Sequence, residues 1–150
     1  MTKPDDTTTT MADRRERGLE MIRSLNNGAD QPTLENLRTE FPFLAEAIAG
    51  FALGEVWSQS GLDHRTRQIA TVAAFAALGL RPFMKIHADY ALNVRVTEQE
   101  LKEVIYLTTV HAGIPQAIEA AQTLSGYLLN AEQRLKAHNV RRSEAVCRDQ

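Results

Sequence analysis

The sequence predicts an all-α protein that folds as a bundle of six to seven helices. Apolar residues recur at intervals of three and four from about residue 12 to residue 135, which is the periodicity of helices that bury one face. No stretch alternates β-branched and polar residues between turn signals, as strands do. Residues that begin or end helices stand between the apolar segments and predict the boundaries.

Three elements are expected in the first part of the chain. The first helix should run over about residues 12–26, and Gly28 stands where a left-handed C-terminal cap belongs. A short turn is expected over about residues 33–39. A helix over about residues 42–57 follows, and its broad apolar surface consists of Phe43, Ala47, Ile48, Phe51, Leu53 and Val56.

The next helix, over about residues 64–79, should be central. Asp63 is its expected N-cap, and after a polar first turn the segment is apolar nearly all round. Pro82 suits the first turn of a helix that ends near Asn93.

Two further helices complete the expected bundle. Thr97 and Glu100 have the spacing of a capping box, which opens a helix from Leu101 to His111. Gly113 ends that helix, and a last helix begins at Pro115, with apolar positions at Ala117, Ala120, Ala121, Leu124, Leu128 and Leu135.

Composition excludes several classes of function. With 43% hydrophobic and 24% charged residues and a net charge of −2, the 150-residue chain has the composition of a globular domain and lacks the basic surface that binds nucleic acid or anionic lipid. No apolar run reaches the ~20 residues of a membrane span, and no signal peptide is seen, so we expect a cytoplasmic protein. The single cysteine, Cys147, lies in a polar tail, which argues against thiol redox chemistry.

One folded domain is expected over residues 12–135. Residues 1–11 contain four consecutive threonines and little to bury, so they are expected to form a disordered leader. Residues 136–150 are polar and are interpreted as a frayed C-terminal tail, with extension of the last helix onto a neighbouring subunit as the alternative.

Polar residues embedded in apolar helices are the candidates for chemistry, because buried polar groups need partners. The sequence has no glycine-rich phosphate loop, metal-binding spacing or nucleophile elbow. The candidates are Glu55, Trp57, Arg65, Arg67, His87, Asn93 and His111.

Most of these candidates also have a purely structural interpretation. His87 fits a hydrogen-bonded core imidazole, and Glu55 fits an ion pair with Arg67. Arg65 fits a solvated first-turn residue, while His111 stands near a helix C-terminus, where the dipole favours an imidazolium. Asn93 is most simply a helix-end residue.

Eight short motifs occur in order between about residues 14 and 129. They read R-x-x-x-G-L-E from Arg14, G-E-V-W from Gly54, G-L-D-x-R-T-R from Gly61, A-A-L-G from Ala76, His87, A-L-N from Ala91, V-T-x-x-E-L-K-E-V from Val96 and A-G-I-P-x-A from Ala112. Together they resemble the carboxymuconolactone decarboxylase family. The resemblance implies an all-α fold, a ring-shaped homotrimer or homohexamer, and sites near subunit interfaces.

The same superfamily includes alkylhydroperoxidases of the AhpD type, which use a C-x-x-C pair ahead of the histidine. At those two positions this chain has Leu80 and Phe83, and Gln68 stands where their relay has a glutamate. The resemblance therefore excludes a thiol peroxidase.

Two departures from the decarboxylase pattern concern the expected pocket. The chain reads ALNVRVT where the family usually has A-L-N-N-G-V-T, and HAG where it often has Y-A-G. Arg95 therefore replaces a glycine suited to a left-handed helix end, and His111 replaces a tyrosine. Both changes favour an altered substrate.

The resemblance implies decarboxylation of 4-carboxymuconolactone to 3-oxoadipate enol-lactone, or a close analogue, in the catabolism of aromatic compounds. The lactone carbonyl accepts the electrons released with carbon dioxide, so no cofactor and no metal is expected. We hypothesise that Arg67, with Arg65 as second choice, anchors a substrate carboxylate through its planar guanidinium.

His87 is the candidate oxyanion donor or proton donor, and Glu55 orients one of these residues or acts as the acid. Trp57, Phe83, Asn93, Arg95 and His111 are the candidates that line the pocket. Two alternatives remain: a cyclase, isomerase or dehydratase of related scaffold in a biosynthetic or detoxification pathway, and a non-catalytic ligand-binding oligomer.

Overall fold

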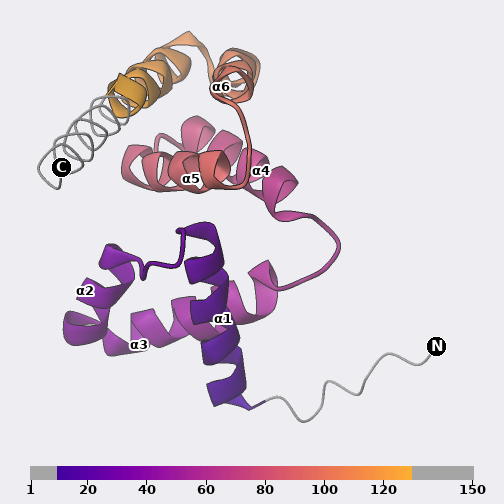
Figure 1. The fold of residues 1–150 in the computed structure, drawn as a ribbon. Coiled ribbons are helices and arrows are strands. Elements are labelled where there is room, and N and C mark those ends of the chain that lie inside the picture. Colours follow the sequence, from indigo (N-terminus) through magenta and orange to yellow (C-terminus); the bar gives the residue numbers. More distant parts are fainter. Residues whose placement is uncertain (1–9, 130–150) are drawn as a thin grey trace, which may run out of the picture. The chain divides into compact units, whose positions relative to one another are not determined.

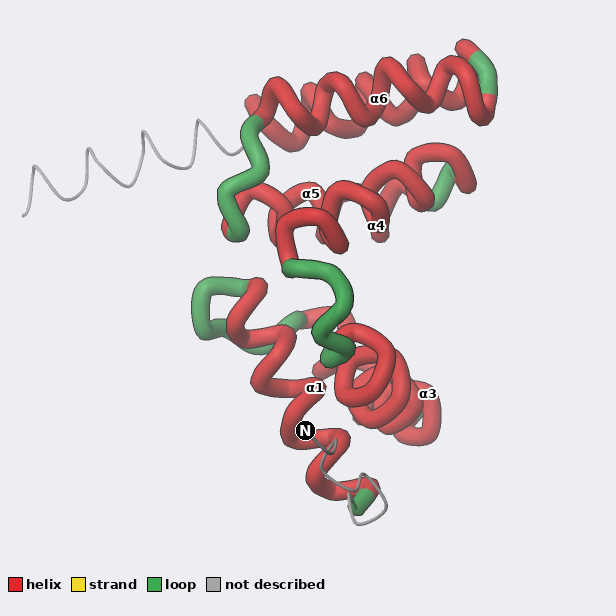
Figure 2. The backbone as a smooth tube through the Cα atoms, turned by 90° about the vertical axis from the view of Figure 1, so that its right-hand side faces the viewer, coloured by secondary structure: helices red, strands yellow, loops and turns green. Residues whose placement is uncertain are grey.

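The computed structural model describes residues 10–129, and these residues are helical between short loops (Figures 1 and 2). Seven helices precede a further helical segment over residues 114–129, and no strand occurs among the residues described. The predicted all-α class is therefore confirmed. Residues 1–9 and 130–150 lie outside the described residues, and with them most of the expected leader, the expected tail and Cys147.

The described chain divides into two units. The first consists of the residues up to Arg67 together with Asn93–Arg95, and the second of Gln68–Leu92 together with the residues from Val96 onward. Each unit is described by itself below.

The first unit begins with α1 (Met11–Leu25), which starts slightly earlier than expected. The Thr10 side chain accepts a hydrogen bond from the backbone of Asp13, and the Asp13 carboxylate accepts one from the backbone of Thr10 at 2.8 Å. This capping box satisfies backbone donors at the helix start. Thr10 and Met11 therefore belong to the folded unit, although both were expected in the leader.

The turn expected over residues 33–39 is a helix, so that prediction is wrong. α2 (Pro32–Glu40) begins with proline, and the Gln31 side chain accepts from the backbone amides of Thr33 and Leu34. Leu34 is buried in the core of the unit. The helix was missed because glutamine is not a usual N-cap, whereas tertiary burial of Leu34 stabilises so short a helix.

The single helix expected over residues 42–57 has two parts. α3 (Pro42–Glu46) continues directly into η2 (Ala47–Trp57), which has π-helical geometry. A π-helix bonds each residue to the fifth one along, so its side chains are spaced differently from those of an α-helix. Apolar periodicity locates the helix but does not distinguish the two geometries.

Helices α1 and η2 pack backbone to backbone through two glycines. A Cβ added at Gly18 would lie 1.9 Å from the carbonyl oxygen of Ala49, and one added at Gly54 would lie 2.0 Å from the carbonyl oxygen of Arg14. Beside this contact lies a small core of Ile22, Leu34, Ala45 and Leu53, against which Leu19, Leu37, Ile48 and Trp57 pack.

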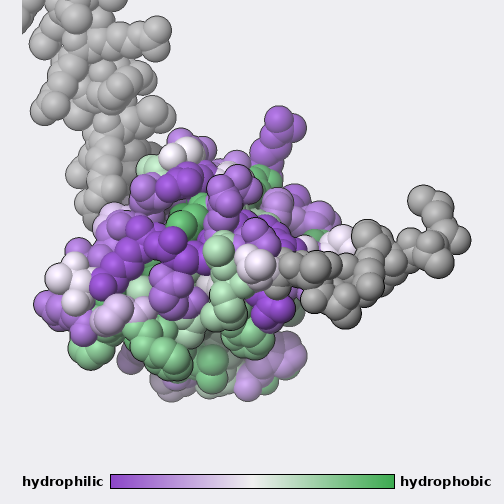
Figure 3. Space-filling model, turned by 90° about the horizontal axis from the view of Figure 1, so that it is seen from below, coloured by the Kyte–Doolittle hydropathy of each residue, from purple (hydrophilic) through white to green (hydrophobic). Residues whose placement is uncertain are grey.

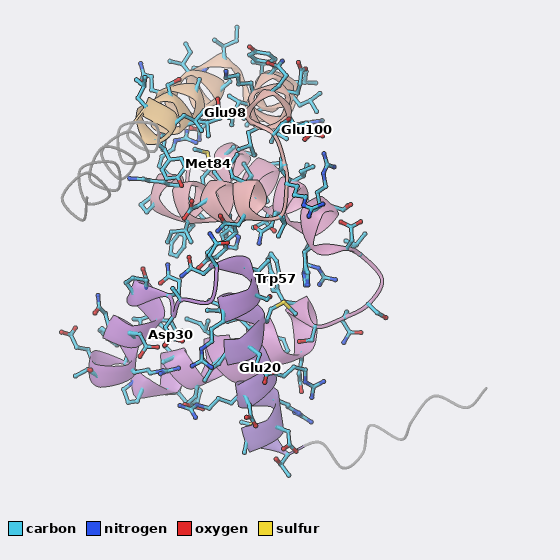
Figure 4. All side chains as sticks on the ribbon, in the orientation of Figure 1. Glu20, Asp30, Trp57, Met84, Glu98 and Glu100 are labelled. Atoms are coloured by element: carbon cyan, nitrogen blue, oxygen red, sulfur yellow. The ribbon has the colours of Figure 1, made fainter. Side chains whose placement is uncertain are left out.

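The second unit contains most of α4 (His64–Leu78), α5 (Arg81–Asn93), α6 (Glu98–Ala112) and the segment 114–129. The predicted start of α4 is confirmed, because Asp63 accepts from the backbone of Thr66 at 2.8 Å. The predicted capping box of Thr97 and Glu100 is also present, but α6 begins at Glu98, three residues before the expected Leu101. Glu98 and Glu100 mark this start in Figure 4. The buried apolar residues of the unit are Val72, Ala76, Met84, Ala88, Tyr90, Ala91, Val96, Leu101, Val104, Ile105, Ala117, Ala120, Leu124 and Leu128.

Three helices end in the same left-handed turn. A backbone amide two or three residues past the helix end bonds to the carbonyl five residues earlier in α1 (Gly28 to Arg23), α4 (Leu80 to Phe75) and α5 (Val96 to Ala91). The residue before each amide has positive φ: 53° at Asn27, 73° at Gly79 and 68° at Arg95. Gly28, predicted as the left-handed cap, also has positive φ (86°), but Asn27 holds the position inside the turn.

We expect Arg95→Gly to stabilise the protein by about 1 kcal/mol. An L-residue in the left-handed region costs about 1–2 kcal/mol relative to glycine, and the exposed Arg95 side chain offsets little of this cost by burial. Urea unfolding of the variant and of Arg95→Ala measures the effect. Equal stability of the two variants would show that the left-handed backbone is not strained.

Large apolar side chains remain exposed in both units. In the first unit they include Phe43, 86% exposed, and Phe51, 62% exposed; in the second, Leu107, Val110, Ile114 and Ile118 are each at least half exposed. The face seen in Figure 3 is largely hydrophilic, with apolar side chains gathered along one edge. Exposed apolar surface of this extent is typical of proteins that bind a partner.

Candidate active site

His87 lies in α5 of the second unit, among polar and aromatic side chains. Its Nδ1 lies 2.9 Å from Oε1 of Gln68, which projects from α4 and is fully buried. The ring centroid lies 5.2 Å from that of Phe75 and 5.5 Å from that of Tyr90, which meets it edge-on. Phe83, a predicted pocket residue, contacts the same group through Phe75 at 5.7 Å.

Burial lowers the pKa of His87 from 6.5 to about 4, because the charged ring loses its hydration among apolar neighbours. The imidazole is therefore neutral at pH 7 and has one ring hydrogen. A neutral imidazole can form hydrogen bonds and accept a proton. A bound anion would raise its pKa and so favour the charged form.

The free energy of unfolding should fall as the pH drops from 6.5 to 4. In this window the unfolded chain binds a proton at His87 before the folded chain does, so acid favours unfolding; above pH 6.5 both states are neutral and the full stability is present. At about 1.4 kcal/mol per pKa unit, the loss approaches about 3 kcal/mol at pH 4.

Urea unfolding of the wild type and of His87→Gln between pH 7.5 and 4 measures this contribution as the difference between the two curves. A difference that does not change with pH would contradict a neutral, buried His87.

Glu55 lies in the first unit, on η2, and is bound by an arginine that the sequence did not single out. Its carboxylate lies 2.5 Å from Nη1 of Arg14 on α1, and both side chains are about one-third exposed (35% and 34%). The two residues border a surface cavity of about 330 Å³ together with Phe43 and Phe51. The structural ion pair considered for Glu55 is thus present, but with Arg14 rather than Arg67.

Arg67 holds the segment that joins η2 to α4. Its guanidinium donates to the backbone carbonyls of Val56 at 3.0 Å, Gln59 at 2.6 Å and Leu62 at 3.0 Å. It also lies over the ring of Trp57, with 5.7 Å between Cζ and the ring centroid. Trp57 lies at the end of η2 (Figure 4). These bonds satisfy carbonyls that the helix end leaves open.

Replacing Arg67 by lysine should lower the free energy of unfolding by about 2 kcal/mol or more. One ammonium group does not reproduce three bonds from a planar fork, and hydrogen bonds to charged groups contribute about 1.5–3 kcal/mol each. Arg65→Lys, two residues earlier on the same helix and exposed, should change stability by less than about 0.5 kcal/mol. Thermal unfolding of both variants provides the comparison, and equal melting temperatures would contradict the structural role of Arg67.

The remaining candidates have separate surroundings. Asn93, in the first unit, donates through Nδ2 to the carbonyl of Leu25 at 2.9 Å and accepts from Asn27 at 2.9 Å, so its amide completes the end of α1. Arg65, Arg95 and His111 are exposed. His111 lies in the last turn of α6 before Gly113, as predicted.

A groove of about 570 Å³ along α1 is lined by Arg15, Arg23 and Glu46 and includes none of the predicted site residues. Over residues 10–129, no group of three or more His, Cys, Asp or Glu side chains has the arrangement of a metal site. No described helix combines the length and apolar character needed to cross a bilayer.

Comparison with known proteins decides the family. Residues 42–125, more than half of the chain, match the model of the carboxymuconolactone decarboxylase family. The chain belongs to this family. The match contains Glu55, Arg67, Gln68 and His87, whereas Arg14 and its motif precede it.

Two decarboxylases are among the relatives of this family member. The chain is 40% identical over 83 residues to the 4-carboxymuconolactone decarboxylase of Acinetobacter baylyi, covering 55% of this chain and 62% of that protein. It is 34% identical over 89 residues to the nitrosuccinic acid decarboxylase npaB of Metarhizium robertsii, covering 56% and 61%. These matches span less than two thirds of either relative. An uncharacterized 15.0 kDa protein of Paracoccus denitrificans is 25% identical over 112 residues, which are 71% of this chain and 84% of that protein.

Sequence reasoning within the family missed two residues. Gln68 was considered only as the loss of a glutamate, because it ends the polar first part of α4, directly before the apolar run, where a polar residue does not by itself indicate burial. Arg14 opens the R-x-x-x-G-L-E motif. Its ion pair with Glu55 joins two helices, and no sequence pattern indicates such a contact.

Proposed function

We propose that this chain is a cofactor-independent decarboxylase of 4-carboxymuconolactone or a close analogue, in the breakdown of aromatic compounds. The observation that carries the proposal is the buried imidazole of His87, which contacts Gln68 and lies between aromatic rings within the part of the chain that matches the family. The Acinetobacter relative, named for this reaction, supports the substrate class.

The reaction requires an electron acceptor and a proton. The bond between the ring carbon and the carboxylate breaks, carbon dioxide leaves, and the electron pair moves through the ring double bond into the lactone carbonyl. A proton then adds to carbon and gives the enol-lactone, so each turnover consumes one proton. Because the lactone accepts the electrons, the protein has to bind the anion, stabilise the oxyanion and supply the proton.

His87 is the proposed source of that proton. Burial keeps the free ring neutral, and the negative charge of a bound substrate raises the pKa of the imidazole so that it takes up a proton on binding. Proton transfer to carbon returns the ring to its neutral form. Of the two roles considered for His87, proton donor is therefore preferred to neutral oxyanion donor.

We propose Arg65 rather than Arg67 as the residue that anchors a substrate carboxylate. Arg65 is exposed at the start of α4, whereas the guanidinium of Arg67 donates to three backbone carbonyls. Trp57, Phe83, Asn93, Arg95 and His111 remain proposed pocket residues. Glu55 is proposed to orient Arg14 rather than to act as the acid, since it is part of an ion pair.

A second candidate substrate is a nitro-substituted dicarboxylic acid. The relative from Metarhizium is named a nitrosuccinic acid decarboxylase and is similar over much of the same length. A nitro group, like a lactone carbonyl, accepts the electron pair that carbon dioxide leaves behind, so the same proton donor would serve both reactions.

The test is carbon dioxide release from enzymatically generated 4-carboxymuconolactone, with nitrosuccinic acid in a parallel reaction. We expect stoichiometric release from the lactone, with formation of the enol-lactone and no added metal or cofactor. Release from nitrosuccinic acid alone would favour the second candidate. Binding of both compounds without gas evolution would overturn the decarboxylase and support a ligand-binding protein.

We further propose that the chain assembles into a homotrimer or homohexamer. The exposed apolar residues of α6 and the following segment, Leu107, Val110, Ile114 and Ile118, support this proposal, because their burial between subunits would remove apolar surface from water. Sedimentation equilibrium measures the assembly, and a monomer at micromolar concentration would contradict it.

A further inference from the structure

We propose that Gln68 is a positioning residue that keeps the hydrogen of the neutral His87 ring on Nδ1, so that the proton of catalysis is taken up and delivered at Nε2. The catalytic part of this inference rests on the proposed function. The position of the ring hydrogen does not, because it can be measured without turnover.

The first support is the contact between the two side chains. Nδ1 of His87 faces Oε1 of Gln68 at 2.9 Å, which is a hydrogen-bond distance. An amide oxygen accepts hydrogen bonds but does not donate them, so the hydrogen in this pair belongs to Nδ1. A neutral imidazole has one ring hydrogen, and Nε2 is then left with its lone pair.

The second support is the burial of Gln68. The residue has no exposed surface, and its Nε2 has no hydrogen-bond partner among the residues described. A buried amide with one group unpaired is unfavourable, and an apolar side chain of similar volume would avoid this cost. The hydrogen bond to His87 therefore gives a reason for glutamine at this position.

The third support is the set of groups around the ring. The ring centroids of Phe75 in α4 and Tyr90 in α5 lie 5.2 and 5.5 Å from the centroid of the His87 ring, and these neighbours restrict its rotation. The Tyr90 phenol is the titratable group among these neighbours. The charged residues of α5 itself have these contacts: Asp89 accepts from Tyr127, Lys85 lies over the Tyr127 ring, and Arg81 pairs with Glu119 of the segment 114–129.

Gln68 then determines how the proton moves. When an anionic substrate binds, Nε2 takes up a proton and the ring carries hydrogen on both nitrogens, with Nδ1–H still bonded to Gln68. Transfer from Nε2 to the substrate carbon forms a C–H bond and restores the neutral ring with its hydrogen on Nδ1. The neutral amide of Gln68 accepts the Nδ1–H hydrogen bond from both the neutral ring and the imidazolium, and it does not strongly favour the imidazolium.

The deciding experiment is nitrogen NMR of the whole protein with ¹⁵N-labelled histidine at pH 7. We expect the His87 signals of a neutral ring with hydrogen on Nδ1, while the exposed His64 provides an internal reference. Hydrogen on Nε2 in the wild type would overturn the proposal, because the Gln68 amide would then donate to Nδ1.

Gln68→Glu should raise the pKa of His87 by at least about one unit, because a carboxylate accepts from Nδ1–H and favours the imidazolium. Gln122→Glu, the same change at an exposed position, should leave this pKa unchanged. A folded Gln68→Glu variant with the wild-type pKa would also overturn the proposal.

Gln68→Met has a side chain of similar volume that accepts no hydrogen bond from Nδ1–H. It is the second variant to test if the buried carboxylate of Gln68→Glu prevents folding. It should move ring hydrogen toward Nε2 and lower kcat by roughly 10²-fold with little change in KM. Unchanged hydrogen placement in this variant would overturn the positioning role.

Failure of the proposed function has a different signature. Hydrogen on Nδ1 without carbon dioxide release from any substrate would contradict the decarboxylase and leave the assignment of Gln68 intact. Hydrogen on Nε2 together with full release of carbon dioxide would overturn the positioning role of Gln68 and leave the proposed decarboxylase activity intact.

Discussion

Replacing His87 by glutamine is expected to lower kcat by roughly 10²–10⁴-fold while the chain still folds and assembles. The loss follows from the proposed role, because glutamine fills much of the same space but delivers no proton at neutral pH. Steady-state carbon dioxide release, normalised to folded protein by circular dichroism, measures the effect. His64→Gln, the same change at an exposed position of α4, should retain full activity.

The pH dependence of the wild type provides a second readout of the same residue. If His87 has to carry a proton in the reacting complex and the free ring has its pKa near 4, kcat/KM should fall about tenfold per pH unit above pH 4. A flat profile between pH 5 and pH 8 would contradict the proton-donor role. A His87→Gln variant with a lower melting temperature but normal turnover would show that the ring is a core imidazole.

A large loss of stability is expected for Gly54→Ala. The added Cβ would lie 2.0 Å from the carbonyl oxygen and 2.8 Å from the carbonyl carbon of Arg14, well inside contact distance, and neither atom is a flexible side-chain end. Helices α1 and η2 would have to separate. We expect a loss of about 3 kcal/mol or more, which is a large part of a typical total of about 5–15 kcal/mol.

Gly50→Ala is the matched control, because it lies on the same π-helix and its added Cβ would meet nothing within 4 Å. Alanine in a helix is favoured over glycine, so this variant should be as stable as the wild type or up to about 1 kcal/mol more stable. Thermal unfolding of both variants makes the comparison. Equal melting temperatures would show that the close approach of the helices is not needed for stability.

Much of the fold could be predicted because it depends on local chemistry. The Thr97–Glu100 capping box and the Asp63 cap involve residues three positions apart, so their hydrogen bonds follow from spacing alone. Helix α2 could not be predicted in this way, because a short helix depends on burial of Leu34 against other helices. The π-geometry of η2 was also missed, since apolar spacing is too coarse to distinguish it.

In the candidate site, too, residue identities could be predicted from the sequence, whereas contacts between helices could not. By residue type and order, the sequence determined that this is an all-α member of the carboxymuconolactone decarboxylase family with His87 as its candidate for proton transfer. Tertiary structure alone decided which groups His87, Glu55 and Arg67 contact, namely Gln68, Arg14 and three backbone carbonyls. The reason is physical: the pKa and hydrogen-bonding state of a side chain depend on burial and on partners that other helices supply, and a single sequence does not specify those distances.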